Sequence, residues 1–445
     1  MAEGWEPLDV AVIGGGIAGG LAAATSLRRA GHSVTIYEQA HYAGEVGASI
    51  SCAANGTRWL EEWEVDISLG KTVILQKLIR HDWKTGEVQS IYDLSDYKDQ
   101  WGWVYNMFHR VNMHEMLMDS ATGRGEGTPA QLRLDHKCKE IDHERGIVTF
   151  ENGVVAQHDM IIGADGIGSA VRRALGIIPT RKQSTSTCYH CVIDASEVSR
   201  LGLLDLTANC AIEFWGGVGI EKIVYSPCRS GEINSFYCFF PTSKSDHASE
   251  GWNHEASVEE LLAPFPDLDE RLLALFRHAR DIKPWRLFVH EPYPHWTIGR
   301  TCVLGDAAHP MLPDQSQGAC QAIEDAAALG IIFGRDYMYT ADVAAGLALY
   351  ERIRKPRATK VQAASARARE NINERIGFSS QKIGYKAAVA TGKLTIDEMN
   401  LYDMRRHVAE AAAPERRSRS DVIPHNSAFG LVMSVSTMPE QLARM

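Results

Sequence analysis

The chain lacks the features that would place it in several common classes of protein. It has no run of about 18 consecutive apolar residues, so no segment is expected to span a membrane. It also has no basic run, and its net charge of −10 argues against a nucleic-acid partner. The N-terminal residues contain no basic and apolar signal segment. We therefore expect a cytoplasmic protein.

Sequence patterns with the spacing of metal ligands are also rare. Nine cysteines are scattered along the chain, and only Cys188 and Cys191 have C-x-x-C spacing, without a second pair or paired histidines. We therefore predict reduced cysteines and no metal site. The 445 residues, 45% of them hydrophobic and 23% charged, are typical of a globular protein with one to three domains.

What the chain does have is an ordered pattern over residues 9–38. A short apolar run at 10–13 predicts a buried strand, and the following residues 14–19 (GGGIAG) satisfy G-x-G-x-x-G. A helix is expected over 21–30 and a second strand over 33–37, followed at once by Glu38. This order is typical of a dinucleotide-binding βαβ unit.

Each part of that pattern has a physical role. Gly14 permits the tight turn, Gly16 lets a pyrophosphate approach the backbone, and Gly19 lets the helix pack on the strand. The N–H groups at the start of the helix would face the phosphates, and Glu38 would accept hydrogen bonds from a ribose. A Gly-rich turn of another α/β fold would explain the glycines, but it would not explain the placement of Glu38.

The rest of the chain alternates between segments with strand-like patterns and segments with helix-like patterns. Residues 71–105 are β-rich, 138–158 form a hairpin around an Asn-Gly turn, and 184–296 form an inserted antiparallel sheet interrupted by a helix over 258–279. Buried strands are expected near 159–166 and 301–304, a long helical region over 318–373 and a weak helix over 396–412. The predicted division is 1–183, 184–296, 297–375 and 376–445.

Two further motifs, taken with the glycine motif, resemble one family. Residues 163–173 (GADGIGSAVRR) resemble the DG motif of group A flavin-dependent aromatic monooxygenases, and residues 305–313 (GDAAHPMLP) resemble their GD motif. The resemblance extends over about residues 8–365 and is nearest to the salicylate hydroxylase-like branch, especially its fungal members. Residues 349–357 (LYERIRKPR) also match the pattern of that branch.

The resemblance implies an α/β fold like that of para-hydroxybenzoate hydroxylase. In such a fold a Rossmann-type FAD-binding domain carries an inserted antiparallel-sheet substrate domain and long C-terminal helices. It also implies that NADPH or NADH, docking without a domain of its own, reduces FAD. The reduced flavin then takes up O2, and its C4a-hydroperoxide hydroxylates a small aromatic substrate. A monomer or homodimer is expected.

The resemblance also assigns residues to the cofactor. Asp306 would bind a ribityl hydroxyl, and the helix from Gly318 would face the flavin pyrimidine. Asp165 with Arg172 would support both FAD and the visiting nicotinamide, or Asp165 would only cap a turn. Arg110 would contact FAD, or lie on the surface. The residues assigned to FAD are Gly14, Gly16, Ile17, Ala18, Gly19, Glu38, Arg110, Asp165, Arg172, Gly305, Asp306, Pro313, Gln317, Gly318 and Ala319.

Candidates for the substrate site are His190, Lys222, Tyr225 and Tyr237 in the inserted sheet, with Pro313 by the reactive edge of the flavin. A strand tyrosine could instead serve packing, and a strand lysine could instead face solvent. His190 and Lys222 stand where relatives carry an arginine and a histidine, which suggests a substrate other than simple salicylate.

The chain departs from the family pattern at one position, and three alternative functions remain to be considered. Residues 313–318 (PDQSQG) have serine at position 316, where the family has glycine or alanine. A flavoprotein of this fold could oxidise an indole or epoxidise an alkene rather than hydroxylate a phenol. The chain could also be a nicotinamide-only dehydrogenase or a non-catalytic flavin-binding protein.

Overall fold

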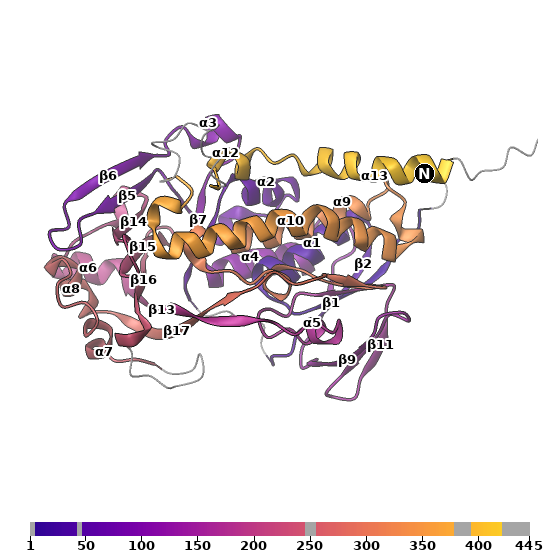
Figure 1. Cartoon of the computed structure of the whole chain (residues 1–445), viewed down its shortest axis with the longest axis horizontal. Helices are drawn as coiled ribbons and strands as arrows, with labels where there is room; N and C mark the ends of the chain where they lie inside the picture. Colours follow the sequence, from indigo (N-terminus) through magenta and orange to yellow (C-terminus); the bar gives the residue numbers. More distant parts are fainter. Residues whose placement is uncertain (1–4, 42–46, 245–254, 378–392, 421–445) are drawn as a thin grey trace, which may run out of the picture.

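The computed structural model describes residues 5–41, 47–244, 255–377 and 393–420, with side chains to residue 413 except that of Ala18 (Figure 1). The first of two large sheets has the strand order β18-β19-β12-β1-β2-β8. Its strands are β1 Asp9–Ile13, β2 Ser33–Tyr37, β8 Gln131–Arg133, β12 Met160–Gly163, β18 Thr297–Ile298 and β19 Thr301–Val303.

The central strands of this sheet explain why the three motifs meet. β1, β12 and β19 are parallel neighbours, and Ile13 lies beside Gly163, which lies beside Val303. Each of these residues is the last of its strand, and one motif follows each strand directly. Because the carboxyl ends of parallel strands share one edge, three distant segments of sequence meet there.

The second large sheet has the order β17-β13-β16-β15-β14-β5-β6 and is antiparallel except where β14 pairs with β5. It takes two of its strands from before residue 184, so the sheet extends beyond the expected insertion. Its strands are β5 Lys77–His81, β6 Val88–Asp93, β13 Arg181–Asp194, β14 Ala211–Gly216, β15 Lys222–Cys228, β16 Ile233–Pro241 and β17 Arg280–His290.

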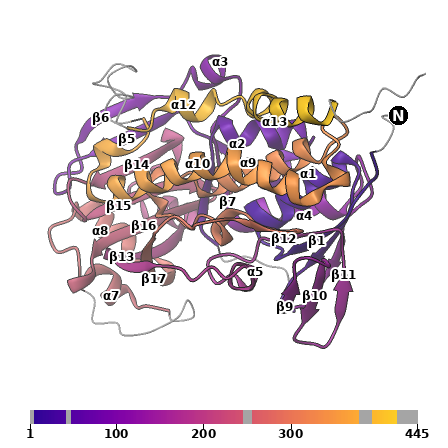
Figure 2. The ribbon, with the colours of Figure 1, turned by 45° about the vertical axis from the view of Figure 1, so that its right-hand side comes forward.

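The remaining strands form two small sheets. The expected hairpin is part of a sheet with the order β11-β10-β9, seen in Figure 2 beside the first large sheet. The other has the order β3-β7-β4 and touches the second large sheet through β15. Their strands are β3 Ser49–Cys52, β4 Val73–Ile74, β7 Asn106–His109, β9 Cys138–Asp142, β10 Ile147–Phe150 and β11 Val155–Gln157.

Larger helices cover the first sheet, shorter ones lie beside the second, and the longest helix crosses the molecule (Figure 1). A π-helical segment, η1 Ile17–Leu21, leads into the first α-helix. Within the described residues no helix has the length and apolar character needed to cross a bilayer. The larger helices are α1 Ala22–Ala30, α2 Ala54–Glu62, α4 Arg110–Thr122, α9 Gly318–Ile332, α10 Val343–Glu370 and α13 Met404–Ser420, and the shorter ones are α3 Tyr97–Trp101, α5 Ala170–Ala174, α6 Ala195–Leu201, α7 Val258–Leu262, α8 Glu270–Phe276 and α12 Ile396–Asn400.

Two expected helices are wrong in extent, and one expected helical region is interrupted. The region 258–279 is two helices, because Pro264 and Pro266 lie between them and Asp269 caps the second. The region 318–373 is broken between α9 and α10, where Met338 has a left-handed backbone. The helix expected over 396–412 is also two helices, of which α13 packs on α9 and α10.

Two hydrophobic cores hold these layers. The larger core includes the first sheet, α1, α4, α9 and α10. The smaller core lies behind the second sheet, where Trp215, Tyr225 and Phe236 pack against α7 and α8. The opposite face of the second sheet is therefore left to line a cavity.

Candidate functional site

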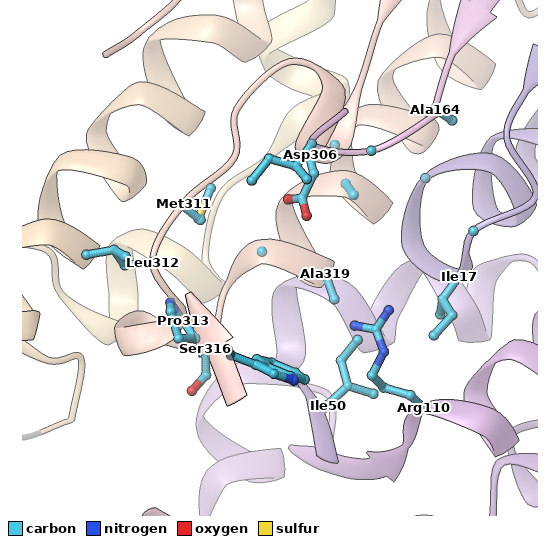
Figure 3. Close-up of a pocket in the computed structure, with 18 of the residues that line it drawn as sticks. Ile17, Ile50, Arg110, Ala164, Asp306, Met311, Leu312, Pro313, Ser316 and Ala319 are labelled. Atoms are coloured by element: carbon cyan, nitrogen blue, oxygen red, sulfur yellow. The ribbon is translucent and has the colours of Figure 1, made fainter. Parts of the chain in front are cut away.

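An elongated cavity joins the carboxyl edge of the first sheet to the inner face of the second sheet. Its volume is about 670 Å³. One end is bordered by Glu38, Lys137 and Arg173, and the other by side chains of β14–β17 and the residues after α10. Figure 3 shows its middle, where Asp306, Pro313, Ala319 and Arg110 surround the open space.

The glycine loop after β1 forms one wall. Gly14 has a φ of +105°, and a side chain there would lie 2.6 Å from the Ala164 carbonyl oxygen. Around Gly16, in contrast, no atom lies within 4 Å of where a Cβ would be, so this backbone borders open space at the start of η1. At Gly19 a Cβ would touch Leu304 at 3.0 Å, which shows how closely the loops approach.

Sequence analysis missed Gly20. A Cβ at this position would lie 1.8 Å from the Gly14 carbonyl oxygen, so only glycine fits. The cause is the π-helical turn, in which the Leu21 N–H donates to the Gly16 carbonyl. Ile17 and Ala18 lie in the same turn, and Ile17 lines the cavity (Figure 3). The doubled glycine was the available signal.

Glu38 lies at the end of β2 and lines the cavity. Its Oε2 accepts a hydrogen bond from the Gly15 N–H at 2.8 Å, and its Oε1 accepts from the Ala40 N–H at 2.9 Å. The carboxylate thus holds the glycine loop while bordering the cavity. This position is compatible with the predicted ribose contact, and it adds a structural role.

Asp165 caps the turn that follows β12. Its Oδ2 accepts from the N–H groups of Ala170 and Val171 at 2.6 and 3.1 Å, and its Oδ1 accepts from the Ser169 hydroxyl. Burial raises the pKa of this carboxyl, although these hydrogen bonds act in the opposite direction. Asp165 also lines the cavity, so the turn cap and the predicted cofactor contact are compatible.

Arg172 does not line the cavity, although Arg173 does. The Arg172 guanidinium donates to the carbonyls of Ile167 and Ala307 at 2.6 and 3.2 Å and lies 5.1 Å from the centre of the Tyr293 ring. It therefore ties the loop after β12 to the loop after β19. Consecutive helical positions point in different directions, which separates the two arginines.

Asp306 projects its carboxylate into the cavity from a short 3₁₀ turn, η5 Gly305–Ala307 (Figure 3). Among the described residues its carboxylate accepts no hydrogen bond, and the residue is exposed to the cavity. Burial raises its pKa, whereas His309, Arg110 and Arg172 lower it. A carboxylate left without a partner at this place fits a ligand that carries hydroxyl groups. Gly305 supports the turn with a φ of +56°.

Arg110 is the first residue of α4, and its backbone N–H donates to Ala48. Figure 3 shows its guanidinium pointing into the cavity between Ile17 and Ala319. The arginine therefore faces the cavity and not the outer surface of the protein. Its positive charge is suited to a ligand with phosphate or carbonyl oxygens.

The start of α9 forms the floor of the cavity. Gly318 and Ala319 line it, and no side chain caps this end, so the first N–H groups of the helix face the open space. Gln317 is buried, and its Oε1 accepts from the Asn55 amide at 3.0 Å. Ser316 has the left-handed backbone, with φ of 54°, that glycine would adopt more easily.

The candidate residues for the substrate site lie on different faces of their strands. Side chains alternate along a strand, so Lys222, Val224 and Ser226 of β15 face the cavity. Tyr225 faces the smaller core instead and is fully buried there. Its assignment to the substrate site is not supported by this position, and its role is packing.

Tyr237 and His190 are cross-strand neighbours on β16 and β13. Tyr237 lines the cavity, and its hydroxyl donates to the Ser49 carbonyl at 2.8 Å. His190 lies outside the lining, with its ring near Trp285 and its Nε2 3.0 Å from the Ser235 hydroxyl. Burial lowers the pKa of His190 to about 3. His190 therefore supports the wall and does not reach the cavity.

Lys222 is buried rather than solvent-exposed, and it forms an ion pair that sequence analysis missed. Its Nζ lies 2.5 Å from Asp314 Oδ1, and Asp314 Oδ2 lies 2.5 Å from Arg369 Nη2. Asp314 belongs to η6 Pro313–Gln315, within the segment that departs from the family pattern. Arg375, after α10, also lines the cavity. No local pattern marks these partners, because they lie far apart in sequence.

The loop cluster fits FAD on structural grounds. The open backbone at Gly16 suits a pyrophosphate, Asp306 has an unused carboxylate, and the start of α9 suits a partly negative ring edge. Glu38 lines the same cavity as these features.

Comparisons with known proteins agree with this fit. The FAD binding domain family matches residues 7–365. FAD-dependent monooxygenase cfoG of Aspergillus candidus is 32% identical over 80% of this chain and 84% of its own length. Hispidin-3-hydroxylase of Neonothopanus nambi is 31% identical over 82% of this chain and 89% of its own length.

The fold is also found among solved structures. A salicylate hydroxylase substrate complex has a TM-score of 0.70 at 22% identity, with 91% of this chain and 98% of that chain covered. The expected fold, a Rossmann-type domain with an added sheet and long helices, is therefore confirmed. The chain belongs to the FAD binding domain family and is an FAD-dependent monooxygenase.

Proposed function

We propose that this monooxygenase hydroxylates a phenolic or other electron-rich aromatic substrate and consumes O2 together with NADH or NADPH. The observation that carries the proposal is the cavity that joins the FAD loops to aromatic side chains of the second sheet. Phe214, Phe239 and Trp285 form that aromatic wall. An aromatic ring buries its faces favourably against such side chains. The name of the hispidin-3-hydroxylase relative supports aromatic chemistry.

The chain's own residues would hold and orient the reactants. Asp306, Arg110 and the glycine loop would bind FAD, and the start of α9 would stabilise negative charge that develops on the ring next to it. Bound FAD would supply the transfer of electrons from NAD(P)H and the activation of O2. The apolar side chains of Met311 and Leu312 would exclude water from the region between flavin and substrate.

The substrate ring would lie between Pro313 and the aromatic wall. Lys222 would face its polar substituent, because its Nζ is the cationic group on the cavity face of β15. An ionised hydroxyl donates electron density to the ring, so a nearby cation would favour the reactive form. This arrangement differs from a simple salicylate site, as the histidine-to-lysine difference suggested.

The test is NADH and NADPH consumption by the purified yellow protein with salicylates, other phenols and indoles, together with product masses. We expect substrate-stimulated consumption and a product heavier by one oxygen. An oxidised indole or an epoxide as the product would assign a non-phenolic substrate class. Flavin-containing protein that oxidises neither nicotinamide with any of these compounds would contradict the proposal.

A further inference from the structure

The buried side chains around the substrate end of the cavity carry more positive than negative charge: Lys222, Arg375 and Asp314 line it, and Arg369 lies outside the lining. Lys222, Arg369 and Arg375 are exposed by only 4%, 1% and 4%, and Asp314 by 7%. Asp314 forms ion pairs with two of these cations, Lys222 and Arg369, at 2.5 Å each. One carboxylate therefore neutralises part of the charge of two buried cations, and Arg375 adds a third cation.

Arg375 adds to this imbalance. Among the described residues its guanidinium donates to two neutral acceptors, the Ile376 carbonyl at 3.1 Å and the Ser316 hydroxyl at 3.3 Å. The nearby carboxylate of Glu374 pairs instead with Lys393 and Arg367. The sequence of residues 378–392, which lies outside the described residues, contains two lysines and neither aspartate nor glutamate.

Some of the donors in this group are also unsatisfied. In the described part of the chain, Nε and Nη1 of Arg369 are buried without a hydrogen-bond acceptor. Buried charge without a counter-charge is strongly unfavourable, and a buried donor without an acceptor also costs free energy. Such a group calls for an explanation, and an anion bound against Lys222 and Arg375, which line the cavity, would supply the missing counter-charge. The group thus has the composition of a site completed by an anion.

The aromatic wall places this charge where a ring would lie. The Arg375 guanidinium lies 5.0 Å from the centre of the Phe214 ring, and the Arg369 guanidinium lies 4.2 Å from that of Phe239. Lys222 Nζ lies 5.3 Å from the same Phe239 ring. Lys222, Phe214, Phe239 and Arg375 all line the cavity, so its cationic and aromatic groups share one surface.

We propose that Lys222 and Arg375 form a subsite for an anionic oxygen of the aromatic substrate, with Asp314 and Arg369 holding Lys222 in position. The subsite selects aromatic compounds that bear a carboxylate or an ionised hydroxyl. A neutral compound of the same size leaves the excess positive charge buried and uncompensated, so it binds weakly. This inference rests on the proposed function, because it specifies the substrate class of the same cavity.

The test measures binding and not turnover. Benzoate and benzamide, which have similar shapes but different charge, are titrated into the purified holoenzyme while the flavin absorbance is followed. We expect benzoate to bind about 10- to 100-fold more tightly, the range given by a charge-assisted hydrogen bond. Equal binding of the two by the wild-type protein would overturn the subsite.

Variants assign the preference to residues. Lys222→Met should abolish it and Lys222→Arg should retain it, whereas Lys244→Met is a matched control because Lys244 pairs with Glu221 on the surface. If Lys222→Met fails to fold, Arg375→Gln should reduce the preference instead. Retention of the full preference in both Lys222→Met and Arg375→Gln would overturn the assignment.

A second pair of probes distinguishes the two sources of negative charge. Pentafluorophenol, which is ionised at neutral pH, is compared with its neutral methyl ether. Preference for benzoate alone assigns a carboxylate, and preference for the phenolate alone assigns an ionised hydroxyl. A charge preference in a protein that oxidises no NAD(P)H with any aromatic compound would leave the subsite intact and contradict the proposed function.

Discussion

The Arg354 guanidinium lies 2.6 Å from the Glu324 carboxylate, and both side chains are fully buried between α10 and α9. Arg354 also contacts Asp325, which accepts from the Gly305 N–H and lies 2.6 Å from His309. A continuous set of charged contacts therefore connects the long helix to the loop that carries Asp306. We infer that this network positions the cofactor loop.

Replacing Arg354 by methionine should destabilise the protein by about 3–5 kcal/mol, because two buried carboxylates lose a shared counter-charge and keep only Arg357 and His309 as partners. Urea denaturation monitored by circular dichroism measures the change. The control is Arg406→Met, since Arg406 pairs with Glu410 on the exposed side of α13 and should change stability by less than about 1 kcal/mol. Equal effects of the two substitutions would contradict a special role for the network.

Asp306→Ala should purify with much less flavin, because the carboxylate that projects into the cavity is lost. The ratio of flavin to protein absorbance measures occupancy, and circular dichroism confirms that the variant is folded. Asp267→Ala, which removes a surface carboxylate 3.7 Å from Lys84, should retain normal flavin. Normal flavin occupancy in Asp306→Ala would count against the ribityl assignment.

Two glycine substitutions should separate folding from cofactor binding. Gly16 has extended backbone with φ of −70° and open space around it, so Gly16→Ala should fold normally and bind FAD more weakly. Gly14→Ala should lower both stability and FAD binding, because its φ is positive and its Cβ would meet the Ala164 carbonyl. Thermal unfolding of the apoproteins and FAD titration test both statements. Identical behaviour of the two variants would contradict the distinct roles.

Stability should fall in acid partly because of His190. Burial lowers its pKa from 6.5 to about 3, so the unfolded chain binds a proton that the folded protein does not. The contribution is present above pH 6.5 and is lost as pH falls from 6.5 towards about 3. Urea denaturation at several pH values in this range gives the free energy of unfolding as a function of pH. The slope of that free energy against pH should be smaller in His190→Gln by up to about 1.4 kcal/mol per pH unit. An unchanged slope would show that His190 is accessible to protons in the folded state.

The motifs were predictable because their chemistry is local. The turn at Gly14, the open backbone at Gly16 and the acid after β2 follow from conformational rules that operate over a few residues. The split of 258–279 was not predicted, although Pro264 and Pro266 mark it in the sequence, and the expected helical region 318–373 did not distinguish α9 from α10.

The side-chain environment of the substrate wall was harder to predict from the sequence. Lys222 and Tyr225 were both candidates, yet only one of them can face the cavity, because strand parity separates them and the register of the sheet decides which face is inside. Arg172 was predicted at the cofactor, and it instead joins two loops while Arg173 lines the cavity.

The sequence by itself determined the family, the FAD-binding loops and the order of the main elements, because these depend on short patterns and on the adjacency of parallel strands. Only the tertiary structure decided that Asp314 pairs with both Lys222 and Arg369, which come from a strand and a helix far from it in the chain. Electrostatic partners depend on distance in space, and that distance is fixed by the packing of α10 and the second sheet around the cavity.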